Sequence, residues 1–116
     1  MRAPSGIAFN KIATEILGKD YDLSLVFINS NQSRVLNRTY RDKDKPTNIL
    51  SFPLDKKTGE IFIDLTLCKK ECASFERTYS NFLQFLFIHG LLHLKGYRHG
   101  STMERTERQY QKKFGV

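Results

Sequence analysis

All three histidines of the chain lie within the eleven-residue stretch HGLLHLKGYRH, at positions 89, 93 and 99. If this region is helical, His89 and His93 lie four residues apart on one face, with Cβ atoms roughly 5–6 Å apart. Two imidazoles at that separation can bind one metal ion at Zn–N distances of about 2.0–2.1 Å. Gly96 can take the positive φ that ends a helix, which would bring His99 back to the same ion. The spacing therefore predicts a metal site formed by His89, His93 and His99.

Three protein ligands leave one coordination position open, which is typical of a catalytic zinc site rather than a structural one. Zinc fits this ligand set, and nickel or another divalent ion is the alternative. The zincin metalloproteases use the same histidine spacing, with a glutamate directly after the first histidine as general base. Here that position is Gly90, which weakens a protease interpretation. Attack would then depend on a metal that lowers the pKa of bound water to about 7, or on a carboxylate from elsewhere in the chain.

Length and charge limit the remaining possibilities. A chain of 116 residues predicts a single domain over residues 1–116 with one hydrophobic core. Nineteen Lys and Arg against twelve Asp and Glu give a formal net charge of +7, which favours a polyanionic partner such as nucleic acid. No segment has the pattern of a signal peptide or the length of a membrane span, so we expect a cytoplasmic protein without membrane association. Cys68 and Cys72 are expected to be reduced thiols on a helix.

The pattern of apolar residues predicts an α+β domain. A first helix would begin after Ser5 as its cap and end at Gly18, and a strand would follow over residues 22–28. Ser30 would cap a short helix, and an extended segment, NILSFP, would end at Pro53. We expect a further strand from Gly59, a helix from Leu65 and a new helical start near Ser74 or Thr78.

The next predicted helix, residues 79–95, is apolar nearly all round, so it belongs at the centre of the domain. Burial would hold His89 and His93 rigidly, as a metal site requires. A last helix is expected over residues 101–114, where Ser101 and Glu104 have the spacing of a capping box.

Two motifs resemble those of one known family, the YbeY endoribonucleases and rRNA maturation factors. HGLLHLKGYRH resembles the family signature HGxLHLxGYDH, and LNRTYRDKDKPTNILSFP, residues 36–53, resembles its other signature; Gly59-Glu60-Ile61 lies where the family has a G-[DE]-I segment. The resemblance covers roughly residues 22–115. Arg98 departs from it, since the family usually has Asp before the third histidine, which puts in doubt a hydrogen bond from that Asp to a metal-binding histidine. The amino-terminal region is also short, so a helix or strand of longer relatives is expected to be reduced.

The resemblance implies a mixed, about four-stranded sheet with the histidine helix buried against it. It also implies a zinc-dependent, single-strand-specific endoribonuclease that acts in rRNA maturation, at the 3′ end of small-subunit rRNA, and in ribosome quality control. The implied partners are rRNA and the ribosome or its small-subunit proteins, whereas the oligomeric state stays open.

Arg41 is the residue most suited to bind a phosphate, because a guanidinium can grip it through two parallel hydrogen bonds. The resemblance agrees, since the matching family arginine is regarded as important for RNA cleavage. Lys43 is a weaker candidate of the same kind. The structural alternative for Arg41 is an ion pair with an acidic neighbour, namely Asp42, Asp44 or Glu60.

The predicted mechanism is hydrolysis of an RNA phosphodiester by zinc-activated water, with Arg41 stabilising the transition-state charge. Glu60 or a phosphate oxygen could serve as general base. Tyr40 and Tyr97 could stack on bases or belong to the core. Two other classes of function stay open: a zincin-like hydrolase or protease, and a non-catalytic ribosome-assembly factor in which zinc stabilises the fold.

Overall fold

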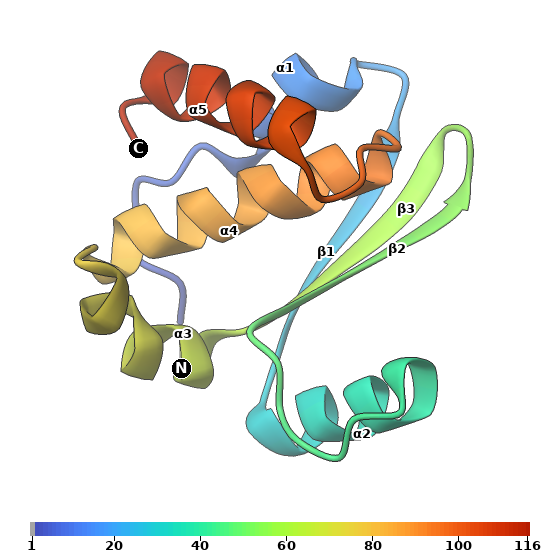
Figure 1. Cartoon of the computed structure of the whole chain (residues 1–116), viewed down its shortest axis with the longest axis vertical. Coiled ribbons are helices and arrows are strands. Elements are labelled where there is room, and N and C mark those ends of the chain that lie inside the picture. Colours follow the sequence, from blue (N-terminus) through green and yellow to red (C-terminus); the bar gives the residue numbers. More distant parts are fainter. Residues whose placement is uncertain (1) are drawn as a thin grey trace.

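A computed structural model describes residues 2–116. Five α-helices, one short 3-10 helix and three strands follow one another along this part of the chain (Figure 1). In chain order they are α1 (Phe9–Leu17), β1 (Asp22–Ile28), α2 (Ser30–Arg41), β2 (Ile49–Asp55), β3 (Thr58–Asp64), α3 (Leu65–Glu71), η1 (Cys72–Phe75), α4 (Tyr79–Leu94) and α5 (Ser101–Phe114).

The three strands form one mixed sheet in the order β1-β3-β2. β1 runs parallel to β3, and β2 runs antiparallel to it, with Ile49 opposite Ile63. The α+β prediction is confirmed, although the sheet has three strands within residues 2–116 rather than about four. Residues 2–8 form no strand. Pro53 lies inside β2 rather than at its end, as an edge strand with an irregular register can accommodate.

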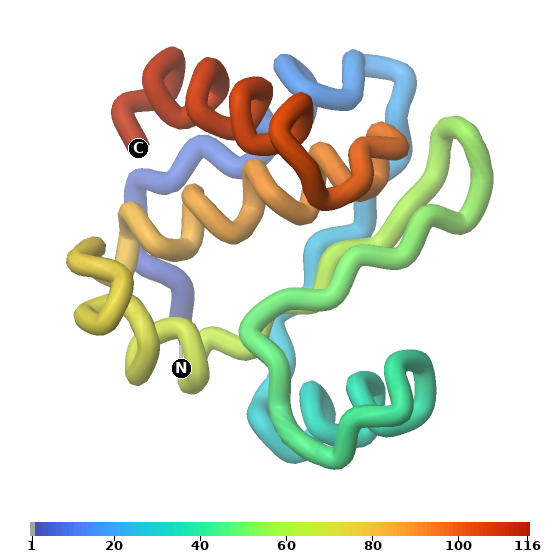
Figure 2. Tube along the Cα trace, in the orientation of Figure 1, coloured from blue at the N-terminus to red at the C-terminus, as the bar shows by residue number. Residues whose placement is uncertain are grey.

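Helices lie on both sides of the sheet. α4 crosses one face, and α1 and α5 pack on the far side of α4, whereas α2 lies beyond the opposite face (Figures 1 and 2). The core is the layer between α4 and the sheet, continued between α4, α1 and α5. Its largest fully buried side chains are Phe82, Phe87, Ile12, Ile16, Ile61, Ile63, Leu83, Ile88, Leu91, Leu92 and Met103. Leu50 is also fully buried, but it alternates with Ile49 along β2 and lies on the opposite face of the sheet.

α4 is the central helix, as its nearly continuous apolar sequence predicts. The Thr78 hydroxyl caps its first turn by accepting a hydrogen bond from Asn81 N at 3.1 Å. At the other end, Gly96 has a φ of +106°, and the next residue, Tyr97, donates its N–H to the carbonyl of Leu92 at 3.0 Å. This left-handed turn reverses the chain after the helix and confirms the role predicted for Gly96.

Three predicted helix caps are wrong. Ser5 lies in a turn with Gly6, and α1 begins four residues later without a side-chain cap. Asn29 caps α2, because its side chain and that of Gln32 form the reciprocal hydrogen bonds of a capping box. The Ser30 hydroxyl instead donates to Asp64 at 2.8 Å, which joins α2 to the end of β3.

At the start of α5, Gly100 occupies the cap position, and no side chain caps the helix. Ser101 is already the first helical residue, so the predicted capping box with Glu104 does not form. The Glu104 N–H donates to the Gly100 carbonyl at 3.0 Å. The side chain of Glu104 is therefore not used by the helix end.

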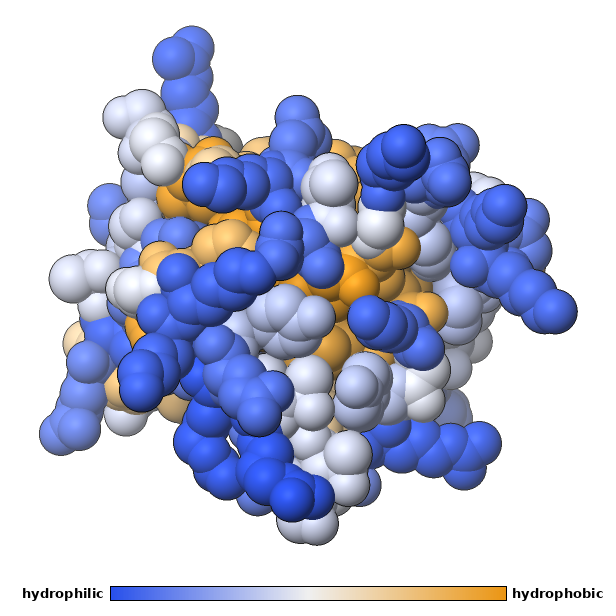
Figure 3. All heavy atoms as spheres, turned by 90° about the horizontal axis from the view of Figure 1, so that it is seen from above, coloured by the Kyte–Doolittle hydropathy of each residue, from blue (hydrophilic) through white to orange (hydrophobic). Residues whose placement is uncertain are grey.

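Viewed from above, the surface is mostly hydrophilic, with hydrophobic side chains visible between the charged ones (Figure 3). Within residues 2–116, no helix combines the length and the apolar character needed to cross a membrane.

Candidate metal centre and adjoining clefts

The three histidines converge at the carboxyl-terminal half of α4. His89 and His93 project from adjacent turns of the helix, and the turn at Gly96 brings His99 to them. One ring nitrogen from each histidine can be chosen so that all three lie within 4.8 Å of one another. His89 Nε2 and His93 Nε2 are 3.0 Å apart. An ion held tetrahedrally at 2.0–2.1 Å would require nitrogen separations of about 3.3 Å, so the cluster can hold a metal ion after small side-chain rotations.

The other ring nitrogens of the two helical histidines have protein partners. His93 Nδ1 donates to the carbonyl of Tyr97 at 3.1 Å, and His89 Nδ1 donates to the carboxylate of Glu107. Donation through Nδ1 leaves each Nε2 with its lone pair directed at the centre of the cluster. Such partners orient metal-binding histidines and fix their tautomers.

Burial and the neighbouring imidazole of His89 lower the pKa of His93 below its usual value. His93 is therefore neutral near pH 7, the protonation state that binds a metal. The electrostatic environment thus agrees with the geometry of the cluster.

Sequence reasoning missed Glu107, which lies eighteen residues from His89 and comes from α5. A signal was present in the sequence. The residues of α5 at positions 103, 107, 110 and 114 form one helical stripe, and the other three are Met, Tyr and Phe. A single carboxylate within an otherwise apolar stripe indicates a buried polar partner. The side chain of Glu107 is indeed only 13% exposed.

Gly90 packs directly against β2. A Cβ atom at this position would lie 2.8 Å from Ile49 Cδ1 and 2.8 Å from Ser51 Oγ. There is no room for any side chain here without a shift of the strand or its side chains. A glutamate, which a zincin protease carries at this position, would therefore fit only if the Ile49 and Ser51 side chains moved away.

A cleft of about 470 Å³ opens on the histidines between α4 and β2. Besides the histidines, the lining comes from the end of α2, from the segment before β2, from β2 itself and from α4. The lining residues are Arg41, Thr47, Asn48, Ile49, Ser51, Pro53, Leu86, His89, His93 and His99. The structure thus brings Arg41, from the opposite side of the sheet, to the same cleft as the predicted metal ligands.

Asp44 pairs with two other arginines of α2. Arg34 Nε lies 2.8 Å from an Asp44 carboxylate oxygen, and Arg38 Nη1 lies 3.9 Å from it. Within residues 2–116, Arg41 forms no ion pair, so its exposed guanidinium is available to a ligand. The structural alternative for Arg41, an ion pair with Asp42, Asp44 or Glu60, does not occur.

Other candidate residues lie outside the cleft. Lys43 is exposed in the loop after α2 and is not among the lining residues. Glu60 alternates along β3 with the buried Ile61, so its side chain is on the face of the sheet away from α4 and the histidines. Tyr40 is 66% exposed and packs on Phe52, with ring centroids 5.1 Å apart, whereas Tyr97 packs against the core.

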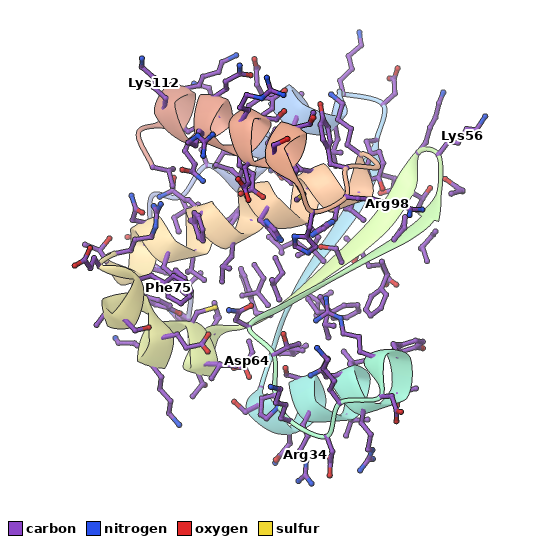
Figure 4. All side chains as sticks on the ribbon, in the orientation of Figure 1. Arg34, Lys56, Asp64, Phe75, Arg98 and Lys112 are labelled. Atoms are coloured by element: carbon purple, nitrogen blue, oxygen red, sulfur yellow. The ribbon has the colours of Figure 1, made fainter. Side chains whose placement is uncertain are left out.

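Arg98, the departure from the family signature, is exposed in the turn after α4 (Figure 4). It neither lines the cleft nor binds a histidine of the cluster. The hydrogen bonds that orient His89 and His93 come from Glu107 and from the Tyr97 carbonyl. An aspartate at position 98 is therefore not needed to hold these two rings.

Comparisons with known proteins identify the family of the chain. The family model described as endoribonuclease YbeY matches residues 7–115. The endoribonuclease YbeY of Sulfurovum sp. is 34% identical over 94% of this chain and 82% of its own, and that of Alkaliphilus metalliredigens is 34% identical over 88% and 71%. The solution structure of TM1509 from Thermotoga maritima superposes with a TM-score of 0.67 at 26% identity, over 92% of this chain and 79% of that one. By its match over nearly its full length, the chain belongs to the endoribonuclease YbeY family.

Proposed function

We propose that this protein is a zinc-dependent endoribonuclease that hydrolyses single-stranded RNA, with His89, His93 and His99 as the metal ligands and Arg41 as the main phosphate-binding residue. The observation that carries the proposal is the shared cleft, which brings three convergent imidazoles and an unpaired guanidinium together. Membership of a family of endoribonucleases supports RNA as substrate, and the net charge of +7 supports a polyanion.

The residues divide the chemistry between them. A bound zinc ion would supply a water nucleophile activated at neutral pH. Arg41 donates to a non-bridging phosphate oxygen and offsets the negative charge that grows there in the transition state. Glu107 and the Tyr97 carbonyl hold His89 and His93 with Nε2 towards the ion. Because Glu60 faces away from the cleft, a phosphate oxygen is the better remaining candidate for general base.

Ribosomal RNA is the substrate class that the family resemblance suggests. On this proposal the protein matures the 3′ end of small-subunit rRNA in the cytoplasm, takes part in ribosome quality control, and meets the ribosome or its small-subunit proteins. A single strand is the expected form of the substrate, because its unpaired bases can leave the stack and enter hollows beside the cleft. Lys43, close to Arg41 in sequence, is the secondary phosphate contact.

The test is cleavage of end-labelled single-stranded RNA by zinc-loaded protein, compared with a duplex of the same sequence. His93→Ala should abolish cleavage, and Arg41→Ala should lower kcat/KM by about 10²- to 10³-fold. Arg34→Ala is the matched control, because Arg34 lies on the same helix, pairs with Asp44 and does not line the cleft. Lys43→Ala should have a smaller effect than Arg41→Ala.

Equal cleavage by the parent protein and His93→Ala would identify a contaminating nuclease and refute the proposal. A non-catalytic assembly factor would give a different result: His93→Ala would lose thermal stability with zinc, RNA binding would persist, and the parent protein would show no cleavage. Equal losses for Arg41→Ala and Arg34→Ala would show that Arg41 acts only through general charge.

A further inference from the structure

A second pocket lies on the other side of the histidines, between α4 and the first turns of α5. Its volume is about 250 Å³. It is lined by Phe85, Leu86, His89, His99, Gly100, Met103, Glu104 and Glu107. Leu86, His89 and His99 also line the larger cleft, so the two hollows meet at the histidine cluster.

The two hollows differ in chemistry. The larger cleft offers hydroxyl, amide and guanidinium groups, which suit a phosphate and a sugar. The second pocket offers an apolar floor, and its only charged side chains are two carboxylates. A phosphate would be repelled there, whereas the flat, largely apolar body of a nucleobase would be accommodated.

The two carboxylates of this pocket are not equivalent. Glu107 accepts the hydrogen bond from His89 Nδ1 and is mostly buried. Glu104 lies one turn earlier on α5, is exposed, and forms no ion pair within residues 2–116. Its free oxygens can accept hydrogen bonds from a ligand but cannot donate, so Glu104 suits an amino group.

The apolar residues of the pocket are fixed by their packing. The Arg77 guanidinium lies over the Phe85 ring, 4.1 Å from its centroid, and donates a hydrogen bond to the Asn81 side chain. Met103 and Leu86 are buried in the core. The pocket is therefore built on side chains that packing fixes, rather than on a loop.

We infer that this second pocket binds the base next to the phosphate held in the larger cleft, and that Glu104 selects a base with an exocyclic amino group, such as cytosine over uracil. The inference rests on the proposed function, because it places the phosphate at the histidine cluster. Cytosine presents an amino group where uracil presents a carbonyl oxygen, and a carboxylate accepts from the first and repels the second.

The experiment uses the zinc-loaded full chain and a short single-stranded RNA whose cleaved bond has been mapped. Each nucleotide beside that bond is replaced in turn by cytosine, by uracil or by an abasic nucleotide. At one of the two positions, kcat/KM should be about 10-fold or more higher for cytosine than for uracil. The abasic nucleotide should also be cleaved poorly at that position.

Glu104→Gln should reduce the ratio of kcat/KM values for cytosine and uracil to less than threefold, because an amide both accepts and donates. Glu76→Gln is the control, since Glu76 is also exposed but follows η1, before the start of α4, and does not line the second pocket; Figure 4 labels the preceding residue, Phe75. Equal cleavage of the cytosine, uracil and abasic substrates would overturn the base pocket while leaving the nuclease intact. A preference that Glu104→Gln leaves unchanged would overturn the assignment to Glu104. No cleavage of any substrate would refute the proposed function itself.

Discussion

Replacing Glu107 should weaken zinc binding without removing a ligand. Its carboxylate accepts a hydrogen bond from His89 Nδ1, with 13% of the Glu107 side chain and 26% of the His89 side chain exposed. Loss of such a partner typically lowers metal affinity by about 10- to 100-fold, or about 1.4–2.7 kcal/mol. Glu107→Gln keeps an acceptor oxygen and loses the charge, so we expect an effect near the lower figure, and Glu107→Ala near the higher.

The assay is a zinc titration in competition with a chromophoric chelator, with and without the substitutions. Glu104→Gln is the matched control, because it removes a carboxylate from the same helix and pocket but not from His89. The stabilisation by a fixed excess of zinc, measured from urea unfolding, should fall by the same free energy as the binding. A second, metal-independent loss of about 1–3 kcal/mol is expected for Glu107→Ala in zinc-free protein, because His89 Nδ1 loses its partner.

An unchanged zinc Kd in Glu107→Gln and Glu107→Ala would refute the reasoning, because the carboxylate would then have no influence on the ligand that it contacts. Equal weakening by Glu104→Gln would also refute it, since a general field of negative charge would then explain the affinity. Comparing the zinc-free variants separates either result from a loss of folding.

Three further predictions concern packing, thiol chemistry and a helix cap. Gly90→Glu should lower the free energy of unfolding by about the 1–3 kcal/mol typical of overpacking, and with it the urea midpoint, because a Cβ there would already lie 2.8 Å from two side-chain atoms of β2. It should create no peptidase activity, and an unchanged midpoint would contradict the prediction. Burial raises the pKa of Cys68 to about 12, so its thiol stays protonated at pH 8. An aromatic disulfide reagent should then react with Cys72 alone in the native protein and with both thiols in denaturant. Fast reaction of both thiols in the native protein would contradict this prediction. Asp64→Ala should lower the free energy of unfolding by about 2–3 kcal/mol, because the buried carboxylate accepts hydrogen bonds from Leu67 N, at the start of α3, and from the Ser30 hydroxyl. Ser30→Ala removes only the second of these hydrogen bonds and should cost about 1 kcal/mol. Equal costs for the two variants would show that the helix cap contributes little.

The sequence was sufficient for the elements whose pattern is local. The run of apolar residues from 79 to 94 predicts a central helix, and Gly96 predicts the turn that returns His99. The strand over residues 22–28 has the predicted bounds although none of its residues is fully buried, because its β-branched and aromatic residues favour an extended chain. Helix caps were less predictable, because Ser5, Ser30 and Ser101 each compete with a neighbour for the cap position. At two of these sites Asn29 and Gly100 occupy it instead.

Contacts between distant segments were the part that the sequence could not supply. Arg41 reaches the cleft only because the chain passes from α2 into β2 at the edge of the sheet beside α4. Glu60 was a reasonable candidate base from its position in a motif. The alternation of β3 decides against it, since the register places the neighbouring Ile61 under α4. Successive residues of a strand point to opposite faces of its sheet. The burial of Ile61 under α4 therefore places the Glu60 side chain on the other face, away from the histidines.

The position after the first histidine joins the chemistry of this site to its packing. In a zincin protease a glutamate there reaches the metal-bound water. Here Gly90 lets α4 approach β2 so closely that Ile49 and Ser51 take the space of a side chain. The same approach makes β2 a wall of the cleft, with Ser51 and the preceding Thr47 and Asn48 beside the histidines. The absence of the protease base and the presence of a polar wall for phosphate therefore have one structural cause, and a residue larger than glycine would disturb both.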